Sequence, residues 1–176
     1  MLDPINYTGW FTEALHGPSN EVWEYDTESG KIVATIYHPV NTPLVLRNEL
    51  RFYLKIMERF AHGTMDVGDI IELVETGRFT LITVAMDGRV VACGCFEILC
   101  YPKYEALRVC LVAGDRKVKS ETWAFQARDA VYSYMRDRGI DHLEMFARPG
   151  AAKKLSEKYQ FKRINERLDI NINEVK

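Results

Sequence analysis

Residues 105–139 read EALRVCLVAGDRKVKSETWAFQARDAVYSYMRDRG, and this stretch decides the fold. Residues 105–113 form an apolar run of strand length, and residues 114–119 form a polar, basic loop. Residues 120–138 follow a helical period, and Gly139 suits the C-terminal end of that helix. The stretch therefore predicts a strand, a short loop and a long helix. The buried face of the helix is expected to carry Trp123, Ala127, Ala130, Val131 and Tyr134.

Strands and helices alternate on the C-terminal side of this stretch. Residues 142–148 alternate between apolar and polar side chains, as a strand does. Residues 149–158 open with a proline and read as a short helix, and residues 161–172 read as the last strand. Strands that are separated by a helix imply a parallel step in the sheet.

Antiparallel hairpins are predicted on the N-terminal side. Residues 79–86 and 89–99 flank Asp87-Gly88, which is a strong two-residue hairpin turn. Residues 21–26 and 31–37 flank a polar turn that ends in Gly30. Because the central runs are apolar at consecutive positions, helices are expected to cover both faces of the sheet.

Two helices are expected between these hairpins. Thr42 is a candidate N-cap with Pro43 in the first helical position, and Gly63 suits the end of that helix. Asp66 is expected to begin a second, shorter helix that ends at Gly77. Together the elements predict an α/β (α+β) fold. Its central sheet is mixed but mostly antiparallel, has about six or seven strands, and carries helices on both faces.

Length and composition favour one ordinary globular domain. The chain has 176 residues, 47% of them hydrophobic, and a formal net charge of −2. This charge argues against nucleic-acid binding and against attraction to an anionic membrane. No apolar run approaches the ~18–20 residues of a membrane helix, and the first ten residues lack the layout of a signal peptide. We therefore expect a single cytoplasmic domain over residues 1–176, in which residues 1–30 form an irregular lead-in and the start of a hairpin.

The four cysteines lie in the stretch that is predicted to form paired strands: Cys93, Cys95, Cys100 and Cys110. Zinc sites prefer Cys-x2–4-Cys pairs that are about a dozen or more residues apart. Cys93 and Cys95 are only two positions apart, and no histidine lies near them. The spacing favours reduced, buried thiols over a zinc site, so no metal is expected.

The order of the elements resembles the GNAT acyltransferase fold. In that family a loop of the form Arg/Gln-x-x-Gly-x-Gly/Ala grips the pyrophosphate of acyl-CoA with backbone amides at a helix N-terminus. The window that lies over this loop is Lys119-Ser120-Glu121-Thr122-Trp123-Ala124. Lys119 takes the basic position and Ala124 the last one. Thr122 stands in place of the first glycine, so its Cβ crowds the backbone, although its hydroxyl could donate to phosphate.

The charged residues around this window have two interpretations. Glu121 adds a negative charge where phosphates would lie, and Arg116, Lys117 and Lys119 could offset it. The alternative is that these three basic residues are simply a solvated loop.

A second GNAT signature resembles Asn-x-x-Ala-x-x-Leu-Tyr-x-x-x-Gly-Phe and lies over residues 149–161. Its alanine, leucine and phenylalanine are matched, whereas Gln160 replaces the glycine and Ser156 replaces the tyrosine. In many family members that tyrosine is the general acid that protonates the leaving thiolate. The resemblance thus makes Ser156 a candidate acid, although serine is much weaker. Tyr159 is a second candidate, with core packing as its alternative.

The resemblance implies direct transfer of an acyl group from acetyl-CoA, or another acyl-CoA, to an amine. The backbone of Leu111, Val112 and Ala113 would then contact the pantetheine arm and the thioester. Glu97 is the candidate base, acting through water, with a solvent-exposed charge at the sheet edge as the alternative. Glu105 is a weaker candidate because it begins a strand.

Two side chains near this site have competing interpretations. Cys110 could form an acyl-cysteine, but no partner histidine is visible, so burial is favoured. Trp123 could stack on a ligand, whereas packing into the core is the favoured role.

Two functions remain open at this point. The order of the elements, the basic loop and Ala124 favour an N-acyltransferase, while Thr122, Ser156 and Gln160 favour a non-catalytic GNAT-like protein that acts through protein–protein contacts. Small phage-encoded proteins with this fold have similar departures, and a homodimer or a protein partner is open in either case. The sequence does not identify the acceptor. The aromatic residues of the N-terminal segment could serve as a contact surface, a lid or core: Trp10, Phe11, Trp23 and Tyr25.

Overall fold

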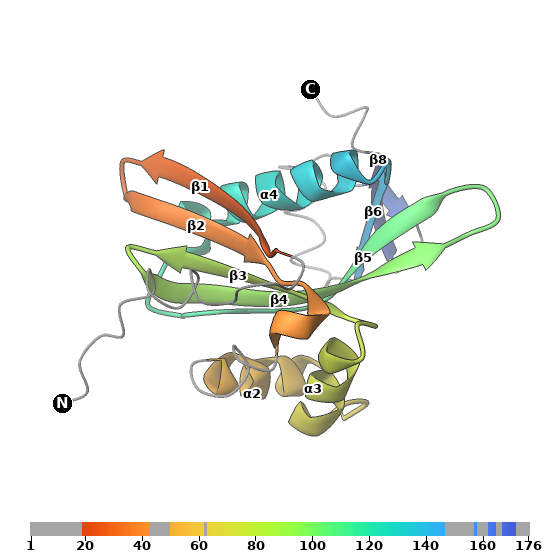
Figure 1. Ribbon diagram of the computed structural model, residues 1–176, viewed down its shortest axis with the longest axis horizontal. Coiled ribbons are helices and arrows are strands. Elements are labelled where there is room, and N and C mark those ends of the chain that lie inside the picture. The colour runs from red at the N-terminus through yellow and green to blue at the C-terminus, as the bar shows by residue number, and fades with distance from the viewer. Residues whose placement is uncertain are drawn as a thin grey trace.

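The fold is built on one eight-stranded mixed sheet (Figure 1). The computed structural model describes residues 19–42, 50–61, 63–146, 157, 162–164 and 167–171. The strands are β1 (Glu21–Thr27), β2 (Gly30–Ile36), β3 (Thr80–Met86), β4 (Arg89–Cys100), β5 (Glu105–Gly114), β6 (His142–Phe146), β7 (Lys162–Ile164) and β8 (Arg167–Asn171). They lie in the order β1-β2-β3-β4-β5-β6-β8-β7, and of these neighbours only β5 and β6 are parallel.

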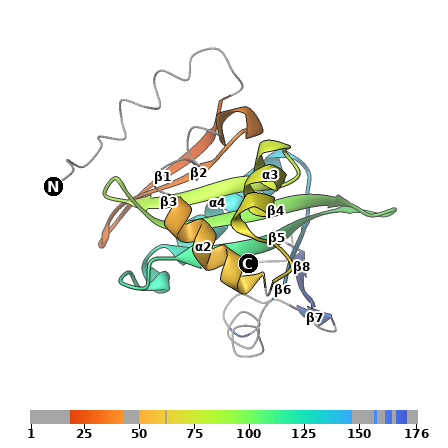
Figure 2. The ribbon, with the colours of Figure 1, turned by 90° about the horizontal axis from the view of Figure 1, so that it is seen from below.

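Helices cover both faces of this sheet. The helical segments are η2 (Pro39–Asn41), α2 (Arg51–Phe60), α3 (Val67–Glu75), η3 (Ser120–Thr122) and α4 (Ala124–Asp137). Figure 1 shows α4 on one face and α2 and α3 on the other, and Figure 2 shows α2 crossing the strands. This arrangement confirms the expected α/β fold class. None of the described helices is long and apolar enough to cross a membrane.

The two N-terminal hairpins form as their turn residues predict. Asp87 and Gly88 both have positive φ angles, 49° and 79°, which a type I′ turn requires. The Asp87 carboxylate accepts a hydrogen bond of 3.0 Å from the Lys31 amide on β2. Gly30 has a φ of 122° and lies against Asp87, so a side chain there would meet that carboxylate. The hairpin turns thereby tie β2 to the β3–β4 hairpin.

The two helices on the α2 side differ in how well the sequence predicts them. Asp66 and Asp69 form a reciprocal capping box at the start of α3, and Gly77 follows its end with a φ of 73°, both as predicted. The predicted cap at Thr42 is wrong. Its hydroxyl donates to the Pro39 carbonyl at 2.6 Å and its backbone is helical, so it closes η2 instead. Residues 43–49 lie outside the described part of the chain.

The C-terminal strand is the main departure from the expected sheet. The segment 161–172 reads as one strand, but β7 and β8 pair with each other in antiparallel fashion. The chain therefore reverses between Ile164 and Arg167, which raises the strand number to eight. β8 also pairs with β6, so it stands between β6 and the edge strand β7.

Two buried clusters hold the helices against the sheet. The cluster on the α2 and α3 side contains Leu54, Met57, Ile70, Leu81 and Leu111. The cluster on the α4 side contains Phe96, Leu107, Met135, Ile140 and Leu143. Side chains alternate between the two faces along a strand. The cluster to which a residue of β4 or β5 belongs therefore shows which face the next residue occupies.

Candidate functional site

The parallel ladder between β5 and β6 covers only part of β5. It begins with Ala106 opposite His142 and ends with Val109 opposite Met145. β5 continues to Gly114, and its residues beyond Val109 have no β6 partner in the part of the chain that the structure describes.

A β-bulge lies where the ladder ends. Cys95 pairs with Leu111 and Phe96 pairs with Val109, so Cys110 is an extra residue on β5. A bulge bends a strand and leaves its extra residue out of the regular pairing. The direction of β5 therefore changes at Cys110, directly after its last pair with β6. No signal in the sequence marked this bulge.

An apolar cavity of about 200 Å³ lies beside the end of the ladder. It lies between α4 and the sheet, where its lining includes Val109, Val112, Leu143, Met145, Ala124 and Val131. Arg128 is the charged side chain among the described residues that line it. A concave, mostly apolar lining that opens at the surface is typical of a small-molecule site, so we regard this hollow as a candidate ligand site.

The predicted phosphate-binding loop folds differently from the expected long helix. Ser120–Thr122 forms a 3-10 turn, and α4 begins only at Ala124, because Trp123 has a φ of −128°. Both the amide and the hydroxyl of Thr122 donate to the Lys119 carbonyl, at 3.0 Å and 2.7 Å. Since a hydroxyl has one proton to donate, the predicted donation from Thr122 to phosphate is wrong in this conformation.

The start of α4 nevertheless keeps the features of an anion site. The first amides of a helix have no partners within the helix, and Trp123 offers no side-chain cap to them. Ala124 stands at the helix start, as the motif predicts. Lys119 is exposed beside it, and the Ser120 hydroxyl donates to the Glu121 carboxylate at 3.5 Å. Phosphate binding by this window stays a prediction.

The Trp123 ring packs against the sheet and does not fill the cavity. It contacts the cluster formed by Ile32, Val84, Val91 and Ala92. A Cβ at Gly114 would lie 3.1 Å from the ring, so the glycine allows this close approach. The indole Nε1 is buried and has no hydrogen-bond partner among the described residues. The favoured core role of Trp123 agrees with this packing.

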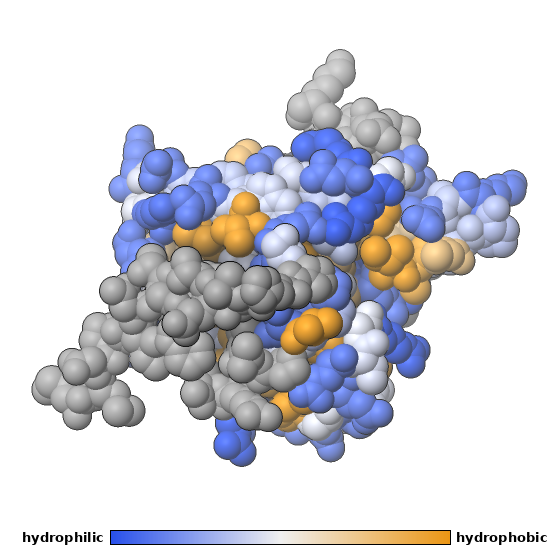
Figure 3. All heavy atoms as spheres, in the orientation of Figure 1, coloured by the Kyte–Doolittle hydropathy of each residue, from blue (hydrophilic) through white to orange (hydrophobic). Residues whose placement is uncertain are grey.

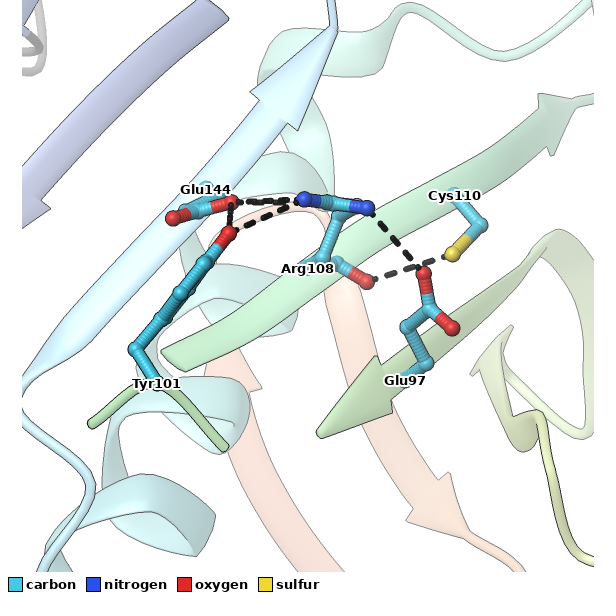
Figure 4. A network of polar contacts seen from close by, with 5 residues as sticks. All are labelled: Glu97, Tyr101, Arg108, Cys110 and Glu144. Carbon is cyan, nitrogen blue, oxygen red and sulfur yellow. Dashed lines mark hydrogen bonds and ion pairs between the residues drawn. The ribbon is translucent and has the colours of Figure 1, made fainter. Parts of the chain in front are cut away.

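A network of charged residues connects β4, β5 and β6 (Figure 4). Arg108 Nη1 lies 3.5 Å from Glu97 Oε1, and Arg108 Nη2 lies 3.2 Å from Glu144 Oε2. The Tyr101 hydroxyl donates to Glu144 Oε2 at 3.2 Å and accepts from Arg108 Nη2 at 3.1 Å. Glu144 is fully buried, so the Arg108 charge and these hydrogen bonds are what make its burial tolerable.

Burial alone would lower the pKa of Arg108, but its hydrogen bond to Glu144 and the nearby Tyr101 and Glu97 raise it above the usual value. Arg108 therefore stays charged. Sequence reasoning missed Arg108 and Glu144. The available signal was a single charged residue inside an otherwise apolar strand, which is rarely buried without a partner.

Glu97 lies one residue beyond the end of the β3–β4 ladder and pairs with Arg108 on β5. Its side chain is 18% exposed and forms an ion pair with Arg108, so it is not the freely solvated charge of the alternative interpretation. Its neighbour Phe96 belongs to the cluster under α4, so Glu97 points to the opposite face. Glu97 therefore lies on the α2 side of the sheet, beside the bulge at Cys110 (Figure 4). Its role as a base stays a prediction.

The thiol of Cys110 is protonated at neutral pH. Burial, together with the negative charge of Glu97, raises its pKa to about 12. The thiol donates to the Arg108 carbonyl at 3.4 Å. Because the thiolate is the nucleophile, this environment argues against an acyl-cysteine. No cluster of three or more histidine, cysteine or acidic side chains suited to a metal occurs within the described ranges.

Of the remaining predicted residues, Glu105 is described and does not join this site. Glu105 is exposed at the start of β5, about 17 Å along the strand from Cys110, and accepts a hydrogen bond from the Cys100 thiol. Ser156 and Tyr159 lie outside the described residues, so their predicted acid roles stay predictions.

Of the four aromatic residues of the N-terminal segment, two lie within the described residues. Trp10 and Phe11 lie outside the described residues. Trp23 packs against the cluster under α4, and the Tyr25 hydroxyl donates to Asp129 on α4 at 2.9 Å. Trp23 and Tyr25 are thus partly buried and pack against the core, as the third of the expected roles has it.

No protein-family model and no curated protein matches the chain. Solved structures do. FeeM, an N-acyl amino acid synthase from uncultured soil microbes, superposes with a TM-score of 0.58 at 14% identity, over 81% of this chain and 92% of FeeM. The Escherichia coli ribosomal-protein-S18-alanine N-acetyltransferase gives 0.56 at 12% identity, over 80% and 94%. A predicted acetyltransferase with acetyl-CoA from Clostridium acetobutylicum gives 0.55 at 9% identity, over 77% and 92%. The chain therefore has the GNAT fold, as the order of its elements predicts.

Proposed function

We propose that this protein is an acyl-CoA-dependent N-acyltransferase. One observation carries the proposal: the β5–β6 ladder ends at Val109, where an apolar cavity lies beside the strands under α4. An open strand edge, a helix N-terminus and an apolar hollow match the three parts of an acyl-CoA: pantetheine amides, pyrophosphate and acyl chain.

The unpaired edge of β5 would hold the pantetheine arm. The backbone of Leu111, Val112 and Ala113 follows the bulge and pairs with β4 on its other side. The amides at the start of α4 would bind the pyrophosphate, together with the exposed Lys119. In this arrangement the amides from Ala124 onward bind the phosphate, because the amides of Thr122 and Trp123 already donate to the carbonyls of Lys119 and Ser120.

Glu97 would act as the base on the acceptor side. Through a water molecule it takes a proton from the acceptor amine, whose nitrogen attacks the thioester carbon. The bond between carbon and sulfur breaks, and the CoA thiolate takes a proton from Tyr159 or Ser156. Arg108 holds the Glu97 carboxylate beside the bulge until the acceptor arrives.

The proteins that share the fold support N-acyl transfer as the reaction type. FeeM is an N-acyl amino acid synthase, and the Escherichia coli protein acetylates an alanine of a ribosomal protein. The acceptor here is accordingly proposed to be an amine, without further identification.

Calorimetric titration with CoA and acetyl-CoA tests the proposal. At 100 times its dissociation constant, bound CoA should stabilise the fold by ~2.7 kcal/mol, which a thermal shift also detects. Lys119→Ala should weaken binding by about tenfold, and Thr122→Gly, which removes the crowding Cβ, should tighten it. Lys103→Ala, an exposed lysine at the tip of the β4–β5 hairpin, is the matched control. No binding at millimolar CoA would refute the proposal.

A non-catalytic role through protein contacts is the second candidate. The β4–β5 hairpin projects from the molecule, and apolar atoms reach the surface beside its base (Figures 1 and 3). Ile98 on this hairpin is 40% exposed. If CoA does not bind, the protein would act through this apolar surface. Ile98→Asp should then change the oligomeric state measured by light scattering.

A further inference from the structure

We propose that the cavity between α4 and the sheet holds the acyl chain of the donor, so that the donor is a medium-chain acyl-CoA of about six to eight carbons. This inference rests on the proposed function and specifies its donor. Acetyl-CoA would then be a poor donor for this protein.

The size of the cavity is the first argument. The cavity is open on one side and measures about 200 Å³. An apolar cavity of about 150 Å³ stays dry and holds benzene, which has six carbons. An acetyl group has two carbons, so it would leave most of the space empty.

The lining is the second argument. The inner wall is formed by apolar side chains that are at most 8% exposed, among them Ile82, Phe96, Val131 and Leu143. The outer wall includes Val112, which is 44% exposed, and the partly exposed Ala124 and Arg128 at the first turns of α4. The cavity thus opens near the start of α4, and its inner wall is apolar, which suits a hydrocarbon chain.

The position relative to the gap is the third argument. Val109 and Met145 form the last pair of the parallel ladder, and both line the cavity. A thioester held at the bulge would therefore have its chain on the α4 side of the sheet. Glu97 lies on the opposite face, so the acceptor amine would approach from the side away from the chain.

The test compares four ligands by calorimetry: CoA, acetyl-CoA, octanoyl-CoA and octanoate. Octanoyl-CoA should bind about tenfold or more tightly than acetyl-CoA, because its extra methylenes are buried in the cavity. Val131→Phe should remove this advantage while CoA affinity stays unchanged. Val22→Phe places the same change on β1, where Val22 is 47% exposed, and should leave all four affinities unchanged.

A second cavity-filling variant, Ala127→Leu, keeps the test valid if Val131→Phe fails to fold, since Ala127 also lines the cavity. Equal affinities for octanoyl-CoA and acetyl-CoA would overturn the inference and leave the proposed function standing. Loss of CoA binding in either cavity-filling variant would also overturn it, because the cavity would then hold pantetheine. Binding of octanoate with no binding of CoA would remove the CoA-dependent function but keep a site for an acyl chain.

Discussion

Replacing Arg108 by methionine should lower the free energy of unfolding more than the same replacement of a surface arginine does. The substitution keeps an apolar stem but removes the charge that Glu97 and Glu144 share. Glu144 is fully buried and would lose the guanidinium at 3.2 Å, while its hydrogen bond from the Tyr101 hydroxyl remains. Breaking one side of a buried ion pair costs about 3–5 kcal/mol. For a domain of this size, that corresponds to a fall in Tm of roughly 6–20 °C.

Urea denaturation followed by tryptophan fluorescence measures this cost. The matched control is Arg89→Met, because Arg89 makes an ion pair of 2.7 Å with Asp115 but is 69% exposed. Because Arg89 is mostly in water and Asp115 keeps its hydrogen bond from the Lys117 amide, the control should cost less than Arg108→Met. A double variant with Glu144→Gln should recover part of the loss, since no buried charge then remains unpaired. Equal costs for Arg108→Met and Arg89→Met would refute the role of burial in this network.

Three further predictions concern single residues. Glu97→Gln should lower kcat by about 10²–10⁴-fold with CoA affinity unchanged in steady-state kinetics, whereas Glu105→Gln should have no effect. The Cys110 thiol, with its pKa of about 12, should react with iodoacetamide slowly at pH 8, where about one molecule in 10⁴ is thiolate, and faster as the pH rises. Fast labelling of Cys110 at pH 8 would contradict the burial of that thiol. Asp66→Ala should cost about 1 kcal/mol in thermal denaturation, because the capping box with Asp69 is lost; an unchanged Tm would contradict it.

Local chemistry explains which elements the sequence predicted correctly. The Asp87-Gly88 turn and the Asp66 cap depend on residues within a few positions of one another, and both form as expected. The break before α4 was missed, because the helical period continues through Trp123 while that ring packs against Gly114 on β5. Such a tertiary contact leaves no mark on local periodicity.

The candidate site depended on both levels. The motif register singled out residues 119–124, and the predicted strands singled out Glu97, but neither gave an indication of Arg108, Glu144 and Tyr101 around it. These residues come from different strands and a hairpin loop, so only strand pairing brings them together. Arg108 lies opposite Glu97 and beside Glu144 because of the register on its two sides.

The amino-acid sequence by itself determined the order of the strands from β1 to β6, the parallel step after the long helix, and hence the GNAT fold, because periodicity, turns and caps are local properties of the chain. Tertiary structure alone decided the bulge at Cys110, the end of the ladder at Val109 and the cavity under α4. Each of these depends on register and packing between segments that are distant in sequence. A bulge or the end of a ladder depends on the partner strand as well, so the pattern of one strand cannot specify it.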